Sequence, residues 1–254
     1  MSDNLAFIND LTAVQIASIC DHSNLATYTS FTGKDEDARI LREQSLRSFL
    51  DATIQSERVP YAVVVLPDLV PLTVEYLDGQ GRNDIKVASA IYFPYGSVNT
   101  AFKVSETKVV TALGAVEVDV VLNYERFTAG DIDYAKDDAK AVADAAHENG
   151  ALVKLIIETC KLSPDQIKAA CYLANETDTD FVKTSAGVWS YGATAEDLRI
   201  IREHFSRGVK MSGADIGPEN VRDLLSASSG RTDGYIELNP SRIRIGEGSL
   251  ISRL

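Results

Sequence analysis

The chain has 254 residues, 45% of them hydrophobic, which is enough to bury a large core. Its net charge of −12 and the lack of a basic cluster count against nucleic acid or an anionic membrane surface as a partner, because like charges repel. The three cysteines form no C-x-x-C pair, so we expect reduced thiols. The start, "MSDNLAFINDL", has no basic region before a long apolar stretch, and no later run reaches the ~20 apolar residues that span a bilayer, so we expect a cytoplasmic protein.

Short runs rich in β-branched residues alternate along the chain with longer helical stretches. Most of these runs are almost continuously apolar, as in "YAVVVLP" and "VEVDVVLN", which is typical of parallel strands covered on both faces. The pattern predicts strands at residues 17–25, 61–67, 85–94, 116–123, 151–159, 180–187, 207–214 and 241–246.

The stretches between the runs carry the start and stop signals of helices. Residues 97–113 and 132–149 are each followed by a glycine, which commonly ends a helix, at Gly114 and Gly150. Two later stretches begin with a side chain that can accept a hydrogen bond from the first free backbone N–H groups. These predicted N-cap residues are Ser163, which a proline follows, and Thr194.

Alternation of this kind over a chain of this length predicts a closed (β/α)₈ barrel, the TIM barrel, with a short helical extension at the N-terminus. An open doubly wound sheet is the alternative, but that fold leads us to expect a glycine-rich phosphate turn after an early strand. The stretch "VVVLPDLVP" has no such turn. Because the chain shows no linker or low-complexity tract, we expect residues 1–254 to form a single barrel domain.

Three predicted strands contain a lysine, although lysine is among the residues least often buried. They are Lys154 in "LVKLIIET", Lys183 in "DFVKTSAG" and Lys210 in "GVKMSG". In a barrel, alternate strand residues face the interior, and catalytic groups gather at the C-terminal ends of the strands. Lys183 and Lys210 each precede a turn of small residues, so we expect their amines to lie close together at that end, on strands ~4.8 Å apart.

Two neighbouring amines in a partly buried site suit covalent catalysis by lysine. Burial and a second cation both lower a lysine pKa from its ordinary ~10.4, and the neutral amine attacks a carbonyl to give a Schiff base. Asp119 in "VEVDVVLN" is a strand carboxylate that would pair with one of these lysines and could carry protons during imine formation. A purely structural ion pair is the alternative, but three strand lysines with Asp119 favour the catalytic interpretation.

The segments "EVDVVLNY", "LVKLIIET", "DFVKTSAG" and "GVKMSG", together with "FPYG", resemble in order and spacing the deoxyribose-phosphate aldolase family of class I aldolases. The similarity runs from about residue 17 to residue 250. It implies a (β/α)₈ fold and, without a cofactor, the reversible cleavage of 2-deoxy-D-ribose 5-phosphate or a related aldose to acetaldehyde and glyceraldehyde 3-phosphate. It also implies the site residues: Lys183 as the Schiff-base lysine, Lys210 as its pKa-lowering neighbour, Asp119 as the proton relay, Lys154 as a further active-site lysine and Asp21 as the acidic residue of the first strand.

The loops at the same end of the barrel indicate where a substrate phosphate would bind. Backbone N–H groups near glycines, with a hydroxyl at a helix N-terminus, make an anion site. Val188 stands where the family usually has a lysine, and the turn at 213–216, "GADI", lacks the family's arginine, so we expect a weaker dependence on the phosphate. The predicted substrate-binding residues are Thr184, Gly187, Gly213, Gly246, Gly248 and Ser249.

Other chemical groups leave alternatives open. The histidines, His22, His147 and His204, lack the spacing of metal ligands, so we expect no metal. Trp189 either walls the substrate site or packs its loop, and Cys160 is either a thiol of the site or a buried spectator.

A sugar- or metabolite-binding barrel without turnover is the alternative function. The expected partner is a small aldehyde or sugar phosphate, and a homodimer is left open.

Overall fold

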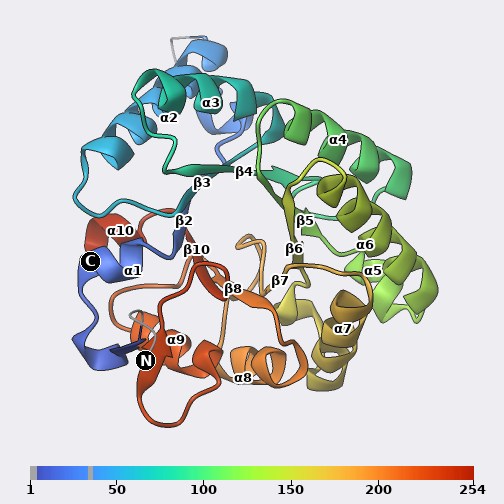
Figure 1. The fold of residues 1–254 in the computed structure, drawn as a ribbon. Helices are drawn as coiled ribbons and strands as arrows, with labels where there is room; N and C mark the ends of the chain where they lie inside the picture. The colour runs from blue at the N-terminus through green and yellow to red at the C-terminus, as the bar shows by residue number, and fades with distance from the viewer. Residues whose placement is uncertain (1–4, 34–36) are drawn as a thin grey trace.

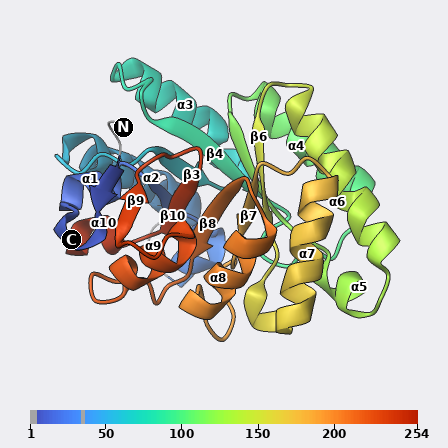
Figure 2. The ribbon, with the colours of Figure 1, turned by 60° about the horizontal axis from the view of Figure 1, so that its bottom comes forward.

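Eight parallel strands close into a barrel in the computed structural model, which describes residues 5–33 and 37–254 (Figure 1). The order around the ring is β10-β2-β3-β4-β5-β6-β7-β8, so β10 closes the barrel between β8 and β2. Helices surround the ring, as a second view shows (Figure 2). The predicted (β/α)₈ barrel is confirmed, and the open sheet is excluded because every strand of the ring has a neighbour on both sides.

Every predicted strand is present, although each is shorter than its apolar run. The largest difference is in β7, where the run 180–187 supplies three strand residues and the remainder forms a loop at the mouth of the barrel. The barrel strands are Cys20–Asn24 (β2), Ala62–Val65 (β3), Lys86–Ile91 (β4), Glu117–Val121 (β5), Leu152–Ile156 (β6), Phe181–Lys183 (β7), Gly208–Ser212 (β8) and Ile243–Glu247 (β10).

The predicted N-caps are confirmed: Ser163 accepts a hydrogen bond from the backbone N–H of Gln166, and Thr194 from that of Asp197. Within the described residues, no helix is long and apolar enough to cross a membrane.

The helices that follow the strands are Ala38–Gln55 (α2), Val70–Gly79 (α3), Thr100–Ala112 (α4), Tyr124–Thr128 (α5), Ile132–His147 (α6), Pro164–Glu176 (α7), Ala195–His204 (α8), Val221–Ser229 (α9) and Leu250–Arg253 (α10).

The α4 helix starts at Thr100, later than the predicted residue 97, because Asn99 caps it: the Asn99 side chain accepts a hydrogen bond from the N–H of Ala101 at 2.9 Å. The N-terminal extension contains the expected short helix, Ala13–Ala17 (α1), and also a strand that the sequence did not predict. This strand, β1, pairs antiparallel with β9 outside the barrel. The remaining elements are Leu5–Phe7 (β1), Tyr235–Glu237 (β9) and the 3₁₀ helices Ile8–Asp10 (η1), Tyr28–Phe31 (η2), Pro67–Leu69 (η3) and Thr159–Lys161 (η4).

The apolar core lies between the barrel and its helices, and the barrel interior is charged. In β5, Val118 and Val120 belong to the main core cluster, while the alternate residues Glu117 and Asp119 join ion pairs within the barrel. Because side chains alternate along a strand, one apolar-looking run supplies both surfaces. This alternation explains how lysines can be buried in apolar strands: their amines meet carboxylates from other strands.

Candidate active site

Two lysine amines share one carboxylate oxygen near the C-terminal ends of β7 and β8. Oδ2 of Asp119 accepts a hydrogen bond from Nζ of Lys183 and another from Nζ of Lys210, each 2.8 Å long. The two lysines are also register partners across β7 and β8. Because both amines bond the same oxygen, they lie no further apart than the sum of the two 2.8 Å hydrogen bonds. Lys210 makes a second ion pair, 2.6 Å long, with Oδ2 of Asp21.

A further layer of charge lies around Lys154. Its Nζ lies 3.0 Å from Oδ1 of Asp119, 2.5 Å from Oε2 of Glu117 and 3.3 Å from Oδ2 of Asp21. Arg244 bridges two of these carboxylates, at 2.5 Å from Asp21 Oδ1 and 2.7 Å from Glu117 Oε1. Glu117 and Arg244 were not predicted as site residues. Each is a charged residue inside an apolar strand run, the same sequence feature that pointed to the lysines.

Burial and neighbouring charges set the protonation of these groups. Burial lowers the pKa of the Lys183 ammonium, Lys210 and Lys154 lower it further, and Asp119 opposes them, which leaves the pKa at about 8. Burial acts on Lys154 in the same direction, but its carboxylates outweigh burial and raise its pKa above the ordinary value. For Asp119 and Asp21, the surrounding cations outweigh burial and hold each pKa below its ordinary value. Lys183, and not Lys154, can therefore supply a neutral amine near physiological pH.

The charges of the network balance only when one cation loses its proton. An uncompensated charge in a protein interior is costly, so the network is stabilised when positive and negative charges are equal in number. Lys183 is the member whose lowered pKa permits that loss. The cations are Lys154, Lys183, Lys210 and Arg244, and the carboxylates are Asp21, Glu117 and Asp119.

A cavity of about 160 Å³ adjoins Lys183 at the C-terminal end of the barrel. Among the described residues that line it, Lys183 is the only cation, so its amine is the group that a bound carbonyl would meet. The lining follows the ends of β2, β7, β8 and β10: Ser23, Leu25, Lys183, Ala186, Gly187, Ser212, Gly213, Ala214, Gly246, Glu247 and Gly248.

Four of the six predicted substrate-binding residues line this cavity: Gly187, Gly213, Gly246 and Gly248. Gly246 is required by its surroundings, because a Cβ atom there would lie 2.8 Å from Cε of Lys210. A side chain at this position would push the lysine away from Asp119.

The other two predicted residues, Thr184 and Ser249, are not part of the lining. The Thr184 hydroxyl donates to the carbonyl of Ser212 at 3.2 Å and accepts from its N–H at 3.0 Å, so it joins the loop after β7 to the end of β8. Ser249 is exposed at the start of α10. Their role in substrate binding remains a prediction.

Glu158 is a polar residue of the site that sequence analysis did not single out. It follows β6 with a left-handed backbone (φ 56°), which is strained for a residue with a side chain. Its buried carboxylate accepts a hydrogen bond of 2.9 Å from the N–H of Ala186, which lines the cavity. Burial raises the pKa of the Glu158 carboxyl. Burial also raises the pKa of the nearby Cys160 thiol, which is not the condition of an activated nucleophile.

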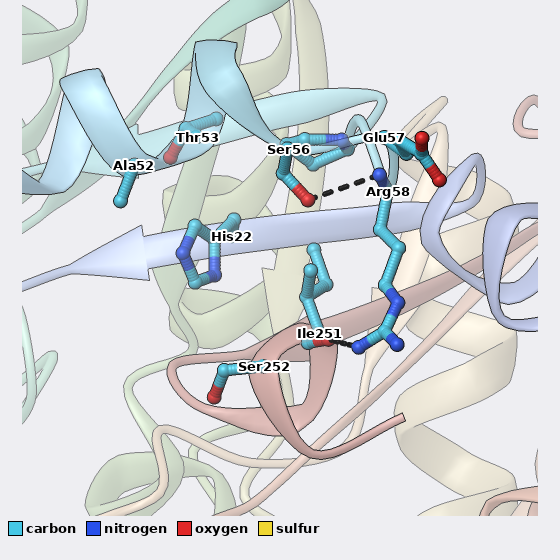
Figure 3. A pocket seen from close by; sticks show the side chains of 9 residues that line it. His22, Ala52, Thr53, Ser56, Glu57, Arg58, Ile251 and Ser252 are labelled. Atoms are coloured by element: carbon cyan, nitrogen blue, oxygen red, sulfur yellow. Dashed lines mark hydrogen bonds between the residues drawn. The ribbon is translucent and has the colours of Figure 1, made fainter.

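A separate cavity of about 300 Å³ lies beside His22 (Figure 3). The His22 ring stacks on Phe49, with centroids 4.4 Å apart, and its Nδ1 lies 2.5 Å from Oε1 of Glu247. Figure 3 shows Arg58 at the other side of this cavity, where its guanidinium donates to the carbonyl of Ile251 at 2.9 Å. No lysine of the network lines this cavity, so it is distinct from the candidate active site.

Comparison with known proteins identifies aldolases. The family model described as DeoC/LacD family aldolase matches residues 61–229. A protein from Thermococcus gammatolerans named deoxyribose-phosphate aldolase is 37% identical over 94% of this chain and 98% of its own length. One from Bacillus licheniformis named deoxyribose-phosphate aldolase 2 is 37% identical over 85% of this chain and 90% of its own.

Solved structures agree with the sequences. An aldolase designated QR15 superposes with a TM-score of 0.74 at 27% identity and covers 93% of each chain. A deoxyribose phosphate aldolase from Aeropyrum pernix, described as tetrameric, has a TM-score of 0.68 at 19% identity and supports the fold, covering 97% of this chain and 92% of its own.

The barrel, the paired lysines and these relatives define a class I aldolase, a lyase that makes and breaks carbon–carbon bonds. More narrowly, the chain belongs to the DeoC/LacD aldolase family. The relatives are named as enzymes, and none of these findings favours the alternative of a binding barrel without turnover.

Proposed function

We propose that the protein catalyses the reversible aldol cleavage of 2-deoxy-D-ribose 5-phosphate, or a closely related aldose, to acetaldehyde and glyceraldehyde 3-phosphate. One observation carries this proposal: Lys183 adjoins the cavity at the barrel mouth, and its pKa is lowered to about 8. The choice of substrate follows the name of the relatives, deoxyribose-phosphate aldolase.

In the proposed reaction, the neutral amine of Lys183 attacks C1 of the open-chain aldehyde. The carbinolamine takes up a proton and loses water to give an iminium ion. Loss of the C3 hydroxyl proton breaks the C2–C3 bond, its electron pair moves toward the iminium nitrogen, and glyceraldehyde 3-phosphate leaves. The remaining enamine takes a proton at C2, and water then releases acetaldehyde and the free amine.

The surrounding charges support these steps. Asp119 touches the amine of Lys183 and is positioned to relay protons as the carbinolamine forms and collapses. Lys210 keeps the Lys183 ammonium destabilised through its own positive charge. Lys154 and Asp21 hold Asp119 and Lys210 in place, and we propose them as positioning residues.

Borohydride trapping tests the proposal. Incubation with 2-deoxy-D-ribose 5-phosphate and borohydride should add the mass of the reduced imine to the peptide that contains Lys183. Labelling that persists in Lys183→Ala would overturn the assignment of the lysine. Binding of the sugar phosphate without any trapping would support a binding barrel instead.

The homodimer also remains a proposal, as does the cytoplasmic location. The A. pernix protein, which shares the fold, is described as tetrameric, and that description supports the proposal of an oligomer. Light scattering coupled to size-exclusion chromatography measures the mass directly, and a mass of one chain would contradict a dimer.

A further inference from the structure

A second, smaller cavity adjoins the one beside Lys183. Its volume is about 110 Å³, and it shares Gly187 and Ala214 with the larger cavity. The two therefore meet across the loops that follow β7 and β8. The remaining lining residues are Trp189, Ser190, Tyr191, Gly192 and Asp215.

Trp189 brings an unused hydrogen-bond donor to this cavity. Its indole Nε1 is shielded from solvent, and no atom of the described residues accepts its hydrogen bond. Buried donors of this kind normally have a partner, and leaving one unpaired is costly. The ring is held from two sides, with Nζ of Lys161 4.1 Å from its centroid and the ring of Tyr95 edge-on at 5.8 Å. Trp189 therefore places a ring with an unpaired N–H at the border of the cavity.

Asp215 brings an acceptor to the same cavity. Its carboxylate packs so closely on two glycines that a Cβ atom at Gly192 or Gly213 would lie 2.4 Å from Oδ1. The N–H of Gly192 donates to Oδ2 over 3.4 Å, a long hydrogen bond. The Asp215 side chain is exposed, and no ion pair to it occurs within the described part of the chain, so no neighbouring side chain neutralises its negative charge.

A donor and a carboxylate on one small cavity suit a hydroxyl group and not a phosphate. A hydroxyl can accept from an indole N–H and donate to a carboxylate at the same time. A phosphate has only acceptors to offer a carboxylate and carries the same sign of charge. Among the described residues no cation lines this cavity, and the Lys161 ammonium lies over the indole ring of Trp189.

We propose that this cavity is a subsite for a hydroxyl group of a neutral, hydroxylated acceptor aldehyde, recognised by Trp189 and Asp215. The proposal rests on the aldolase function proposed above, because it concerns the aldehyde that adds to the enamine on Lys183. Gly187 and Ala214 line both cavities, so the proposed subsite lies next to the cavity in which the acceptor reacts.

Acceptor selectivity tests the subsite. The aldol addition of acetaldehyde is measured with three acceptors: D-glyceraldehyde, which carries hydroxyls, propanal, which has none, and glyceraldehyde 3-phosphate. Trp189→Phe removes the N–H and keeps a ring, and Asp215→Ala removes the carboxylate. Glu219→Ala is the matched control, because Glu219 is an exposed carboxylate in the next turn and lines neither cavity.

Loss of one such hydrogen bond should lower kcat/KM for D-glyceraldehyde about 3- to 10-fold in Trp189→Phe and Asp215→Ala, and change that for propanal less than twofold. Asp215→Ala should also raise kcat/KM for glyceraldehyde 3-phosphate by about 3-fold, because a like charge is removed. Glu219→Ala should leave kcat/KM for D-glyceraldehyde and for glyceraldehyde 3-phosphate unchanged relative to that for propanal. Equal losses for D-glyceraldehyde and propanal would overturn the subsite.

Two controls separate failure of the subsite from failure of the proposed function. Borohydride trapping with acetaldehyde alone should persist in Trp189→Phe and Asp215→Ala; its absence from the unmodified enzyme would contradict the aldolase mechanism, not the subsite. Trp189 is also the only tryptophan of the chain, so its emission reports on the subsite alone. In Lys183→Ala, which cannot form the imine, D-glyceraldehyde should shift that emission and propanal should not; identical responses to the two would contradict the proposal.

Discussion

Oδ2 of Asp119 accepts a 2.8 Å hydrogen bond from the amine of Lys183, and the same oxygen accepts a second one from Lys210. One carboxylate oxygen thus faces two amines and cannot fully compensate both charges. A cation that shares its counter-ion in a buried site is the more easily deprotonated. Burial, and after it the neighbouring charge of Lys210 that shares this counter-ion, lower the pKa of Lys183 to about 8.

The first prediction concerns pH and Lys210. Since the neutral amine reacts, kcat/KM should rise with pH through about 8, the pKa of Lys183. Lys210→Leu removes a cation and leaves Oδ2 of Asp119 to Lys183 alone, and both changes raise the Lys183 pKa. Two charges ~5–6 Å apart at an effective dielectric of about 20 interact by ~3 kcal/mol, so we expect a shift of about two pKa units and on the order of 10²-fold less neutral amine at pH 7. An unchanged pH–rate profile in Lys210→Leu would remove this role.

The second prediction concerns Glu158, whose carboxylate holds the N–H of Ala186. Glu158→Ala removes that acceptor and should lower kcat/KM about 10-fold, because the loop that lines the cavity loses its anchor. Glu158→Gln keeps an oxygen in the same place and should stay within about threefold of the parent. Residue 158 cannot ionise in Glu158→Gln, so the pH–rate profile of this variant should rise only through the pKa of Lys183, as in the parent. A Gln variant as impaired as the Ala variant would show that the charge, and not the anchor, matters.

The third prediction concerns the substrate phosphate. Val188 and the turn at 213–216 offer no cation, and among the described residues that line the cavity Lys183 is the only cation. Charge-assisted hydrogen bonds contribute roughly 1.5–3 kcal/mol each, against ~0.5–1.5 for neutral ones. We therefore expect kcat/KM for 2-deoxy-D-ribose 5-phosphate to exceed that for 2-deoxy-D-ribose by less than about 10³-fold, or ~4 kcal/mol. A larger preference would mean that another group, such as Lys161, supplies the charge.

The fourth prediction concerns a buried ion pair outside the active site. Lys103 of α4 donates to Oδ2 of Asp138 at 2.6 Å and to the carbonyl of Val121 at 2.9 Å, with both charged side chains buried. Asp138→Ala leaves the ammonium buried without its counter-ion and should cost about 3–5 kcal/mol in the free energy of unfolding. The control is Asp144→Ala in α6, the helix that also contains Asp138. It breaks an exposed ion pair with Lys140 and should cost less than about 0.5 kcal/mol in the free energy of unfolding. Equal losses in urea denaturation would contradict this account.

Much of the fold could be predicted because its signals are local. Apolar runs, helix caps such as Ser163 and terminal glycines such as Gly150 act over a few residues, and they predicted the strands of the barrel and its class. The ends of elements were less predictable. The run 180–187 reads as one strand, but only tertiary contacts such as those between Thr184 and Ser212 decide where β7 stops and the loop begins.

The barrel and its strand lysines could be predicted because apolar runs between helical stretches, and charged residues inside those runs, are visible in the chain. Which charges meet could not be predicted, since it depends on how the strands are arranged around the ring. Asp21 comes from β2 and Glu117 and Asp119 from β5, and closing the ring brings these carboxylates onto Lys154, Lys210 and Arg244. The pairing of Trp189 with Asp215 across one cavity likewise depends on how two loops pack. Distances between strands and loops follow from barrel closure and packing, which no short stretch of sequence encodes.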